Sequence, residues 1–428
     1  MVILCVCFRQ AESRRSLPTK AFKPKWHFWA TRPIRIENNL SRFQEREGVA
    51  VLLNSLKTSL AISFLFLSGM SCSCLGQDQE VSTWNKEKAA EYLDSRAETW
   101  LEWESSNRGN DTSCVACHTG QPYAMARHLL RIANGTVAIS NAEKKTIAGV
   151  KLRVKDFDSV TYYYEFSDKK IAESRATEAI QNALICATLD SQNGLENVSE
   201  VTLIAMDNLW KAQETSGANK GGWSWLDFEL EPWESSDAQF YGAAMAASAV
   251  GIAPKYVNRN AKVTERTEML REYLTSRYER QHLHNKMEML LAASRLDGLL
   301  TDDQKRRLVD LVFARQKTDG GWSLVSLGSK TTNPDFKWKR KDNSDQIDES
   351  DGYGTGYAVY VLRNAGVASD DQRIGKAVNW LKTNQLADGN WRGNSLNKKR
   401  NASTNIGKFM DDAATAYAVL ALLETQSP

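Results

Sequence analysis

Cysteine is scarce in the main part of this 428-residue chain. Of seven cysteines, four precede residue 77, and only Cys114, Cys117 and Cys186 follow it. Two closely spaced cysteines without further partners exclude a disulfide-stabilised framework. Cys186 lies in the apolar run 183–187, where a free cysteine behaves as a small hydrophobic residue. The pair Cys114 and Cys117 therefore needs another explanation.

The main part of the chain also lacks an excess of positive charge. The whole sequence has 55 Lys and Arg against 52 Asp and Glu. Residues 1–76 hold 11 and 4 of these, which leaves 44 and 48 for residues 77–428. No basic stripe with interleaved aromatic residues occurs in that part of the sequence. We therefore expect no nucleic-acid partner.

Long hydrophobic runs are missing as well. The apolar run 60–67 follows Lys57 and precedes several small residues up to Gly76. This layout is typical of a secretory signal peptide and is too short to span a bilayer comfortably. We predict a signal peptide over 51–76 and export to the periplasm or another extracytoplasmic compartment. The alternative for the apolar run is a buried hydrophobic helix of the domain. The Arg-rich residues 1–50 are predicted to be a disordered extension or to follow from a start assigned too far upstream.

The chain contains instead a repeated motif with the order Gln, Gly, Trp. It is complete at 316–322, recurs at 385–391, and is looser over 213–223. Each copy follows a segment with helical apolar spacing and precedes a run of small residues. Such self-similarity predicts stacked helical pairs. The Gly allows a sharp turn, the Trp buries a large area, and the Gln can bond a neighbouring helix end, so we interpret the motif as structural.

Apolar periodicity predicts helices along the whole main part of the chain. The predicted segments are 89–104, 123–133, 172–189, 201–213, 238–250, 263–280, 283–296, 303–315, 357–364, 370–383 and 413–424. We pair the segments that flank each Gly-Trp loop. The segment 141–168 is predicted to be irregular, because its part 160–166 has the composition of a strand.

The Gln-x-x-x-Gly-x-Trp spacing at 316–322 and 385–391 resembles the QW repeats of squalene–hopene and oxidosqualene cyclases. The resemblance covers roughly residues 84–428. It implies an all-α fold, an α/α toroid of stacked helical hairpins, which protein prenyltransferase β-subunits and complement thioester domains share. We expect one toroid over 77–428, with a cavity for an apolar small molecule. The prenyltransferase zinc ligands and the thioester Cys-Gly-Glu-Gln are absent, so neither activity is expected.

Triterpene cyclases of this family protonate their substrate with an Asp-x-Asp-Asp motif at the start of an inner helix. The nearest match contains Asp411 and Asp412 but has Phe409 in place of the first Asp. The resemblance thus makes Asp411 and Asp412 candidate catalytic acids of a cyclase-type isomerase. Asp412 also opens a run of small residues, as Asp237 and Asp351 do. An aspartate at such a place caps a helix, and we favour capping over catalysis.

The motif Cys114-Val-Ala-Cys117-His118 has the spacing of c-type haem attachment. Two thioether bonds hold the macrocycle there, and the adjacent His binds the iron. The motif resembles that of cytochromes c. Met125 and His128 lie on one face of the following helix and are candidates for the sixth iron ligand. A five-coordinate iron is equally open.

Other chemistry can use the loop 113–119. One alternative is a zinc site formed by Cys114, Cys117 and His118, with or without His128. Another is a redox dithiol or a disulfide. Our first hypothesis is an exported toroid with one covalent haem c that acts in electron transfer, with a redox partner protein, or in haem-assisted oxidation. A cyclase-type isomerase and a non-catalytic binding toroid are the alternatives.

Overall fold

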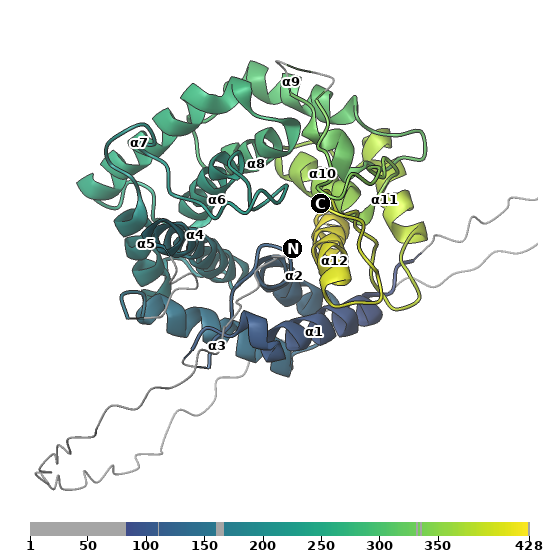
Figure 1. Ribbon diagram of the computed structural model, residues 1–428, viewed down its shortest axis with the longest axis horizontal. Helices are drawn as coiled ribbons and strands as arrows, with labels where there is room; N and C mark the ends of the chain where they lie inside the picture. Colours follow the sequence, from purple (N-terminus) through teal and green to yellow (C-terminus); the bar gives the residue numbers. More distant parts are fainter. Residues whose placement is uncertain (1–82, 110, 160–166, 331–332, 334–335, 427–428) are drawn as a thin grey trace, which may run out of the picture. The chain divides into compact units, whose positions relative to one another are not determined.

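The computed structural model describes residues 83–109, 111–159, 167–330, 333 and 336–426. These residues form two concentric rings of α-helices (Figure 1). The inner ring consists of α2 (Gly120–Ala133), α4 (Asp168–Gln192), α6 (Ala238–Ile252), α8 (Leu283–Ala293), α10 (Gly352–Asn364) and α12 (Phe409–Glu424). The outer ring consists of α1 (Lys86–Glu102), α3 (Asn141–Lys155), α5 (Glu200–Ala212), α7 (Ala261–Arg277), α9 (Asp302–Phe313) and α11 (Gln372–Thr383). The predicted all-α toroid is confirmed.

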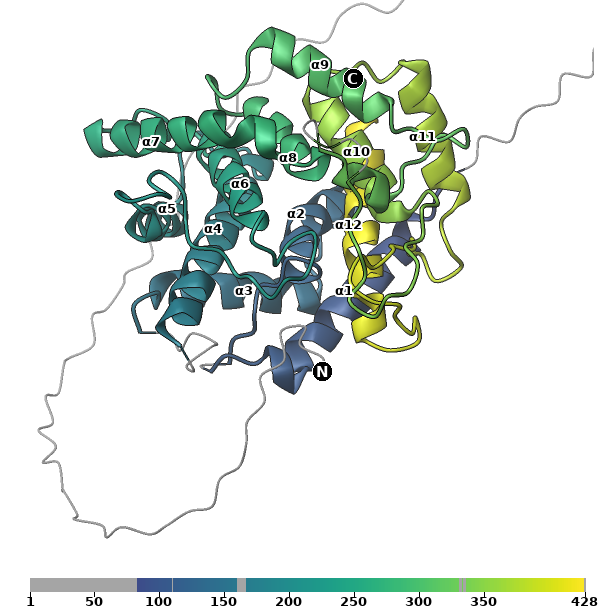
Figure 2. The ribbon, with the colours of Figure 1, turned by 45° about the horizontal axis from the view of Figure 1, so that its top comes forward.

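The inner ring is closed. Each inner helix packs against the next, and α12 packs against α2 (Figures 1 and 2). The inner helices are buried all round, as their composition requires: nearly every residue of α6 is buried, and most are Ala, Gly or another small or apolar residue. The outer helices are amphipathic, and α9 buries only Leu308, Val312 and Phe313. Burial thus follows the sequence pattern of each ring.

The packed helical pairs differ from the predicted ones. From α3 to α11, each outer helix packs more on the inner helix that precedes it in the chain than on the inner helix that follows. Those two helices are joined by a short turn. The three connections that carry the Gly-Trp motifs, from α5 to α6, α9 to α10 and α11 to α12, are long. The prediction that the two helices flanking a Gly-Trp loop pack as a pair was therefore wrong. An outer helix packs more on the inner helix to which a short turn joins it.

Another correction concerns the segment 141–168, which was predicted to be irregular. Residues Asn141–Lys155 form the outer helix α3, which begins where the Ser140 side chain accepts a hydrogen bond from the backbone N–H of Glu143. Residues 160–166 lie outside the described part of the chain, as do the predicted signal peptide 51–76 and extension 1–50. Short 3-10 turns occur at Glu104–Ser106, Tyr278–Arg280, Leu324–Gly328 and Ile406–Lys408.

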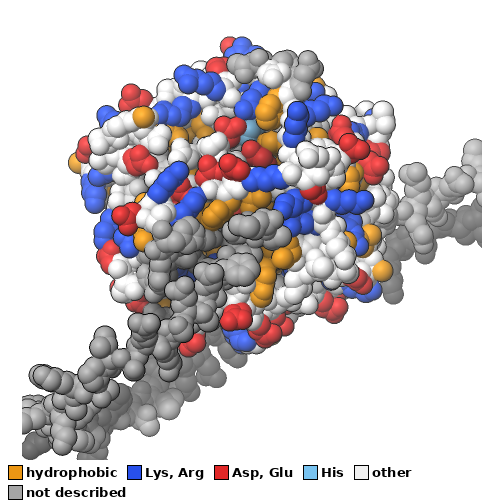
Figure 3. Space-filling model, viewed as in Figure 1, with side chains coloured by type: hydrophobic (Ala, Val, Ile, Leu, Met, Phe, Trp, Pro, Cys, Tyr) orange, Lys and Arg blue, Asp and Glu red, His pale blue; other side chains and the backbone are white. Residues whose placement is uncertain are grey.

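The described residues hold little β-structure, limited to isolated bridges such as that between Asn107 and Ser113. None of the described helices combines the length and apolar character needed to cross a membrane. On the face drawn in Figure 3, Lys and Arg side chains are interspersed with Asp and Glu. The surface of that face therefore does not carry a stripe of one sign.

The tryptophans of the three motifs are fully buried, and each makes an equivalent hydrogen bond. Each indole N–H donates to a carbonyl near the C-terminal end of its own outer helix. The pairs are Trp223 with Leu209, Trp322 with Val312 and Trp391 with Leu381, at 2.8, 2.7 and 2.7 Å. Burial of the large ring and satisfaction of a helix-end carbonyl both support a structural role.

The glutamines and glycines join each loop to the next outer helix. Each Gln side chain donates both to the carbonyl of its own loop glycine and to a carbonyl in or beside that helix. The acceptors outside the loop are Arg266 for Gln213, Arg373 for Gln316 and Asn85 for Gln385. Gly389 has φ +90° and lies so close to Lys88 that a Cβ atom would be 2.3 Å from its carbonyl carbon. The third loop therefore closes the ring onto α1.

Gln385→Ala is expected to lower the free energy of unfolding by about 1–3 kcal/mol, because it removes three hydrogen bonds. Gln385 donates to the carbonyls of Asn85 and Gly389 at 2.9 Å each and accepts from the Asn85 N–H at 2.7 Å. Urea unfolding followed by circular dichroism measures the loss. Gln372→Ala, at an exposed position of α11, should change stability by no more than about 0.5 kcal/mol. Equal losses would contradict the closing role of Gln385.

Candidate functional site

The cysteine loop connects α1 to α2 at one end of the inner ring. Its backbone is held by α1 and by the turn that follows: the Trp100 indole donates to the Cys114 carbonyl at 2.6 Å, and the Cys114 N–H donates to the Ser106 carbonyl at 2.9 Å. Cys114 is partly buried beside Trp100, Trp103 and Phe409. The motif thus occupies an ordered loop between an outer and an inner helix.

A buried ion pair fixes the beginning of this loop. The Arg153 guanidinium of α3 donates to both carboxylate oxygens of Glu178 in α4, at 2.5 and 2.7 Å, and to the Thr112 hydroxyl at 2.9 Å. The side chains of Arg153 and Glu178 are 0% and 8% exposed. Two helices and the loop therefore share one buried charged cluster two residues before Cys114.

Cys117 is buried against α4. Its Sγ lies 2.9 Å from the Nε2 of Gln181, and burial raises the pKa of the thiol well above its ordinary value. The thiol is therefore protonated near neutral pH, and its surroundings do not favour a reactive free thiolate. A redox dithiol formed with Cys114 has little support from this environment.

His118 is buried among aromatic rings. Its imidazole stacks on Phe409 with a centroid distance of 4.0 Å and meets the Trp100 ring edge-on at 5.0 Å. Nδ1 lies 2.7 Å from the Thr119 hydroxyl. Burial, with a contribution from Arg96, lowers the pKa of His118 to about 3, so the ring is neutral. Its Nε2 is buried without a hydrogen-bond partner among the described residues.

Asp412 is linked to this histidine through the Thr119 hydroxyl. Its carboxylate accepts from Arg96 Nε at 2.7 Å and Nη2 at 3.1 Å, from the Tyr92 hydroxyl at 3.1 Å and from the Thr119 hydroxyl at 2.7 Å. Helix α1 supplies Arg96 and Tyr92, and α12 supplies Asp412. The carboxylate thus joins the first helix, the cysteine loop and the last helix.

Asp411 has a different and purely structural environment. It matches Asp351 of the preceding repeat, because the aspartate and the threonine four residues later make the same bonds in both. In the preceding repeat, Asp351 accepts from the Leu324 N–H and Thr355 accepts from the Trp322 N–H. In the last repeat, Asp411 accepts from the Gly393 N–H and Thr415 accepts from the Trp391 N–H. Asp411 also pairs with Arg392 at 2.7 Å. The aspartate that repeats is therefore Asp411, and Asp412 corresponds to Gly352.

The predicted capping role holds for one of three aspartates. Asp351 caps α10 by accepting from the Gly354 N–H at 2.9 Å. Asp237 precedes α6 but makes no side-chain cap bond, and it pairs with Lys330. Asp412 lies inside the first turn of α12, so its capping role was wrong. The small-residue runs indicated where the inner helices begin. At α12, however, the aspartate that opens the run lies one residue past the position that corresponds to Asp351.

Cys117 and His118 line a cavity of about 40 Å³. Residues of the α5–α6 loop, including Trp233, of the segment before α12, including Ile406, and of the start of α12, including Met410, complete its wall. This volume holds one or two water molecules. The donor set of two thiols and a neutral imidazole with an unpartnered Nε2 fits a c-type haem, and the cavity must widen to take a macrocycle.

The other predicted iron or zinc ligands lie elsewhere. Met125 is buried with its sulfur 2.7 Å from Gln121 Nε2, and His128 shares its Nδ1 with Arg131 at 2.8 Å. Neither lines the cavity beside His118. Among the residues that the structure describes, no group of three or more His, Cys, Asp or Glu side chains could hold a metal ion. The predicted zinc set is therefore not assembled.

The centre of the inner ring is filled by buried side chains. Tyr241 of α6 and Tyr417 of α12, which belong to opposite sides of the ring, are 2% and 4% exposed. Glu288 accepts from the Tyr357 hydroxyl at 2.7 Å, and burial raises the pKa of Glu288 to about 7. Aromatic rings from α6, α8, α10 and α12 thus pack against one another inside the ring of helices.

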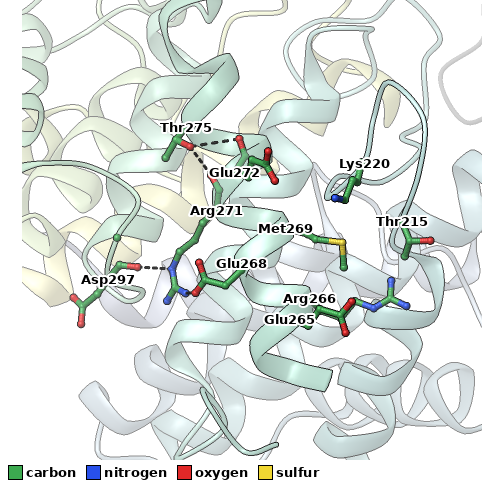
Figure 4. A pocket seen from close by; sticks show the side chains of 11 residues that line it. Thr215, Lys220, Glu265, Arg266, Glu268, Met269, Arg271, Glu272, Thr275 and Asp297 are labelled. Carbon is green, nitrogen blue, oxygen red and sulfur yellow. Dashed lines mark hydrogen bonds and ion pairs between the residues drawn. The ribbon is translucent and has the colours of Figure 1, made fainter. Parts of the chain in front are cut away.

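A much larger hollow, about 1340 Å³, lies along α7 and the loop after α5 (Figure 4). Its lining alternates in charge: Glu268 bonds Arg271, which also donates to the Asp297 carbonyl at 2.8 Å, and Lys220 lies on the facing loop. These side chains bond one another, and no group of catalytic type converges in it. We therefore regard it as a surface groove.

Two residues at the cysteine site were missed by sequence reasoning. Arg96 occupies the buried stripe of α1 together with Leu93 and Trp100. A charged residue at such a position requires a partner, and that signal could have identified it. Thr119 gave no signal, because its role depends on a carboxylate that is 293 positions away in the sequence.

Residues 350–427 match the family model of the squalene-hopene cyclase C-terminal domain, so this part of the chain is squalene-cyclase-like. No curated protein matches the sequence. Among solved structures, the chain is similar to the α-1,6-mannanase GH76A of Salegentibacter sp. HEL1_6, with 12% identity over 80% of this chain and 99% of that one and a TM-score of 0.45. It is similar to the type II terpene cyclase MstE of Scytonema, with 14% identity over 78% and 97% and a TM-score of 0.37.

Proposed function

We propose that this protein is an exported squalene-cyclase-like toroid that carries one c-type haem on Cys114 and Cys117, with His118 as an iron ligand. It acts in electron transfer with a redox partner protein or in haem-assisted oxidation. The observation that carries the proposal is that Cys117 and His118, two members of one Cys-x-x-Cys-His motif, line the same cavity. When bound, haem supplies a one-electron redox centre.

The surroundings of His118 support a ligand role over a packing role. The Nε2 of His118 is buried without a hydrogen-bond partner among the described residues, as are ring nitrogens of His128, His282 and His284. Of these histidines, only His118 belongs to the Cys-x-x-Cys-His motif. His118 is neutral, its other ring nitrogen is bonded, and its ring is fixed between Phe409 and Trp100. These are the features of an imidazole held ready for a metal.

The isomerase alternative has weaker support. A proton-donating acid must hold a proton, whereas Asp411 and Asp412 each face an arginine that favours the ionised form. Burial raises the pKa of both carboxyl groups, but each is already occupied by several hydrogen-bond donors.

Covalent haem is the expected result when the whole chain is produced behind a host export signal in bacteria that carry cytochrome c maturation. Haem that stays with the polypeptide through denaturing electrophoresis measures attachment. Cys114→Ala and Cys117→Ala should each remove most of this signal, because each deletes one thioether bond. Cys186→Ala is the matched control, since Cys186 is buried in α4 and belongs to no motif; it should retain haem.

Absence of haem from the unaltered protein, with zinc bound or with Cys114 and Cys117 joined in a disulfide, would overturn the proposal. That result would favour a non-catalytic binding toroid. Equal haem loss in Cys186→Ala and in the motif variants would indicate a general folding defect. Circular dichroism of each variant separates such a defect from the loss of attachment.

A further inference from the structure

We propose that Asp412 is a positioning residue that acts through the Thr119 hydroxyl to hold His118 with its Nε2 lone pair available to a metal. The identity of that metal as haem iron rests on the function proposed above. The inference concerns a hydrogen-bonded series that runs from Arg96 to Asp412, Thr119 and His118. It gives a ligand-orienting role to a carboxylate that the sequence suggested as a catalytic acid.

The direction of each hydrogen bond follows from which groups carry a proton that they can donate. A guanidinium can only donate and keeps its charge, so the carboxylate that faces Arg96 through Nε and Nη2 is ionised and can only accept. Burial raises the pKa of Asp412, and the guanidinium and two hydroxyl groups oppose that effect. The single hydroxyl proton of Thr119 is therefore donated to Asp412.

The tautomer of His118 follows from this direction. Since the Thr119 hydroxyl has already donated its proton, its oxygen can only accept at Nδ1, which lies 2.7 Å away. Nδ1 must then carry the ring proton, and Nε2 of the neutral ring has a lone pair. That nitrogen is buried, has no partner in the described residues, and belongs to a side chain that lines the cavity shared with Cys117.

Such an arrangement does more than fix an orientation. Metal-binding histidines commonly donate their second ring N–H to a carboxylate or another acceptor, which raises the basicity of the ligating nitrogen. A negative charge behind the Thr119 hydroxyl has the same effect at His118. Stronger donation from Nε2 favours the more highly charged, ferric form of a bound iron. The series therefore lowers the reduction potential, as well as holding the ring.

Three variants separate positioning from folding. Thr119→Val keeps the shape of the side chain but removes the hydroxyl, while leaving the ion pair between Arg96 and Asp412 in place. Thr119→Ser keeps the hydroxyl and should restore the original behaviour. Asp411→Asn is the matched control, because Asp411 is the neighbouring carboxylate on α12 and bonds Arg392 and Gly393 instead.

Two measurements on the full chain give independent results. In protein produced without haem, nitrogen NMR of the imidazole should show the Nδ1–H form of His118 in the unaltered chain and in Thr119→Ser. A mixture of both tautomers is expected in Thr119→Val. In haem-loaded protein, Thr119→Val should raise the midpoint potential by about 59 mV, equivalent to a tenfold loss of preference for ferric iron.

The outcomes distinguish this inference from the proposed function. If the unaltered chain carries no haem but shows the Nδ1–H form only when position 119 has a hydroxyl, the positioning role stands and the haem proposal fails. If haem is present but the tautomer and the potential are the same in Thr119→Val and Thr119→Ser, the positioning role is wrong. A change of potential in Asp411→Asn as large as in Thr119→Val would also overturn it.

Discussion

Trp391→Ala is expected to lower the free energy of unfolding by about 3–5 kcal/mol, the usual loss for a large aromatic side chain in a core. Trp391 is 0% exposed, packs near Trp84 at a centroid distance of 6.0 Å, and donates to the Leu381 carbonyl. Its loss leaves a cavity at the closure of the ring and a helix-end carbonyl without its donor. Chemical denaturation followed by circular dichroism measures the change.

Two further replacements test the reason for this loss. Trp380→Ala, on the outer helix of the same repeat, should cost clearly less, because Trp380 is only partly buried. Trp391→Phe keeps an aromatic ring but removes the indole N–H, so an intermediate loss is expected, and this variant remains measurable if the alanine variant does not fold. Equal losses at Trp380 and Trp391 would show that the motif has no special structural role.

Glu178→Gln should be comparably destabilising, by about 3–5 kcal/mol, since it removes one member of a buried ion pair. The Arg153 guanidinium would lose the carboxylate that receives two of its hydrogen bonds. It would retain its bond to the Thr112 hydroxyl. Urea unfolding gives the change in stability, and hydrogen exchange of residues 112–118 shows whether the cysteine loop loosens.

The double replacement Arg153→Met with Glu178→Leu is the informative comparison. Removing both charges should cost less than removing one, because neither member of the pair then stays buried without the other. Asp158→Asn, which breaks an exposed pair with Lys211, should change stability by less than about 1 kcal/mol. A double variant less stable than Glu178→Gln would mean that the shape of the ion pair, and not its charge balance, is what the fold requires.

The sequence predicted the ring because the ring is built from repeated local units. Trp322 and Trp391 each bond their own outer helix ten residues earlier, so the pattern that carries the bond is local and visible. Helix α10 was predicted to begin at 357 but begins at Gly352. Glycines have low helix propensity, and Gly356 is tolerated because it packs directly against the backbone of Ala418. Tertiary contact thus overrode local preference at that helix start.

The register of the repeats also required the tertiary structure. By sequence, Asp412 opens the small-residue run of the last repeat, but the bonds made by Asp411 and Thr415 show that Asp411 is the repeating residue. Phe409, which stands where the related motif has an aspartate, stacks on His118. The position at which this chain differs from the cyclase motif therefore contacts the cysteine loop.

By itself, the sequence determined the all-α toroid, the structural role of the Gln and Trp residues, and the motif of Cys114, Cys117 and His118. Each of these is a pattern of near neighbours, and spacing along the chain records it. Only the tertiary structure decided which carboxylate meets the histidine. Closure of the ring brings Asp412 of the last helix to Arg96 of the first, across 316 positions. No local pattern records a contact that ring closure creates.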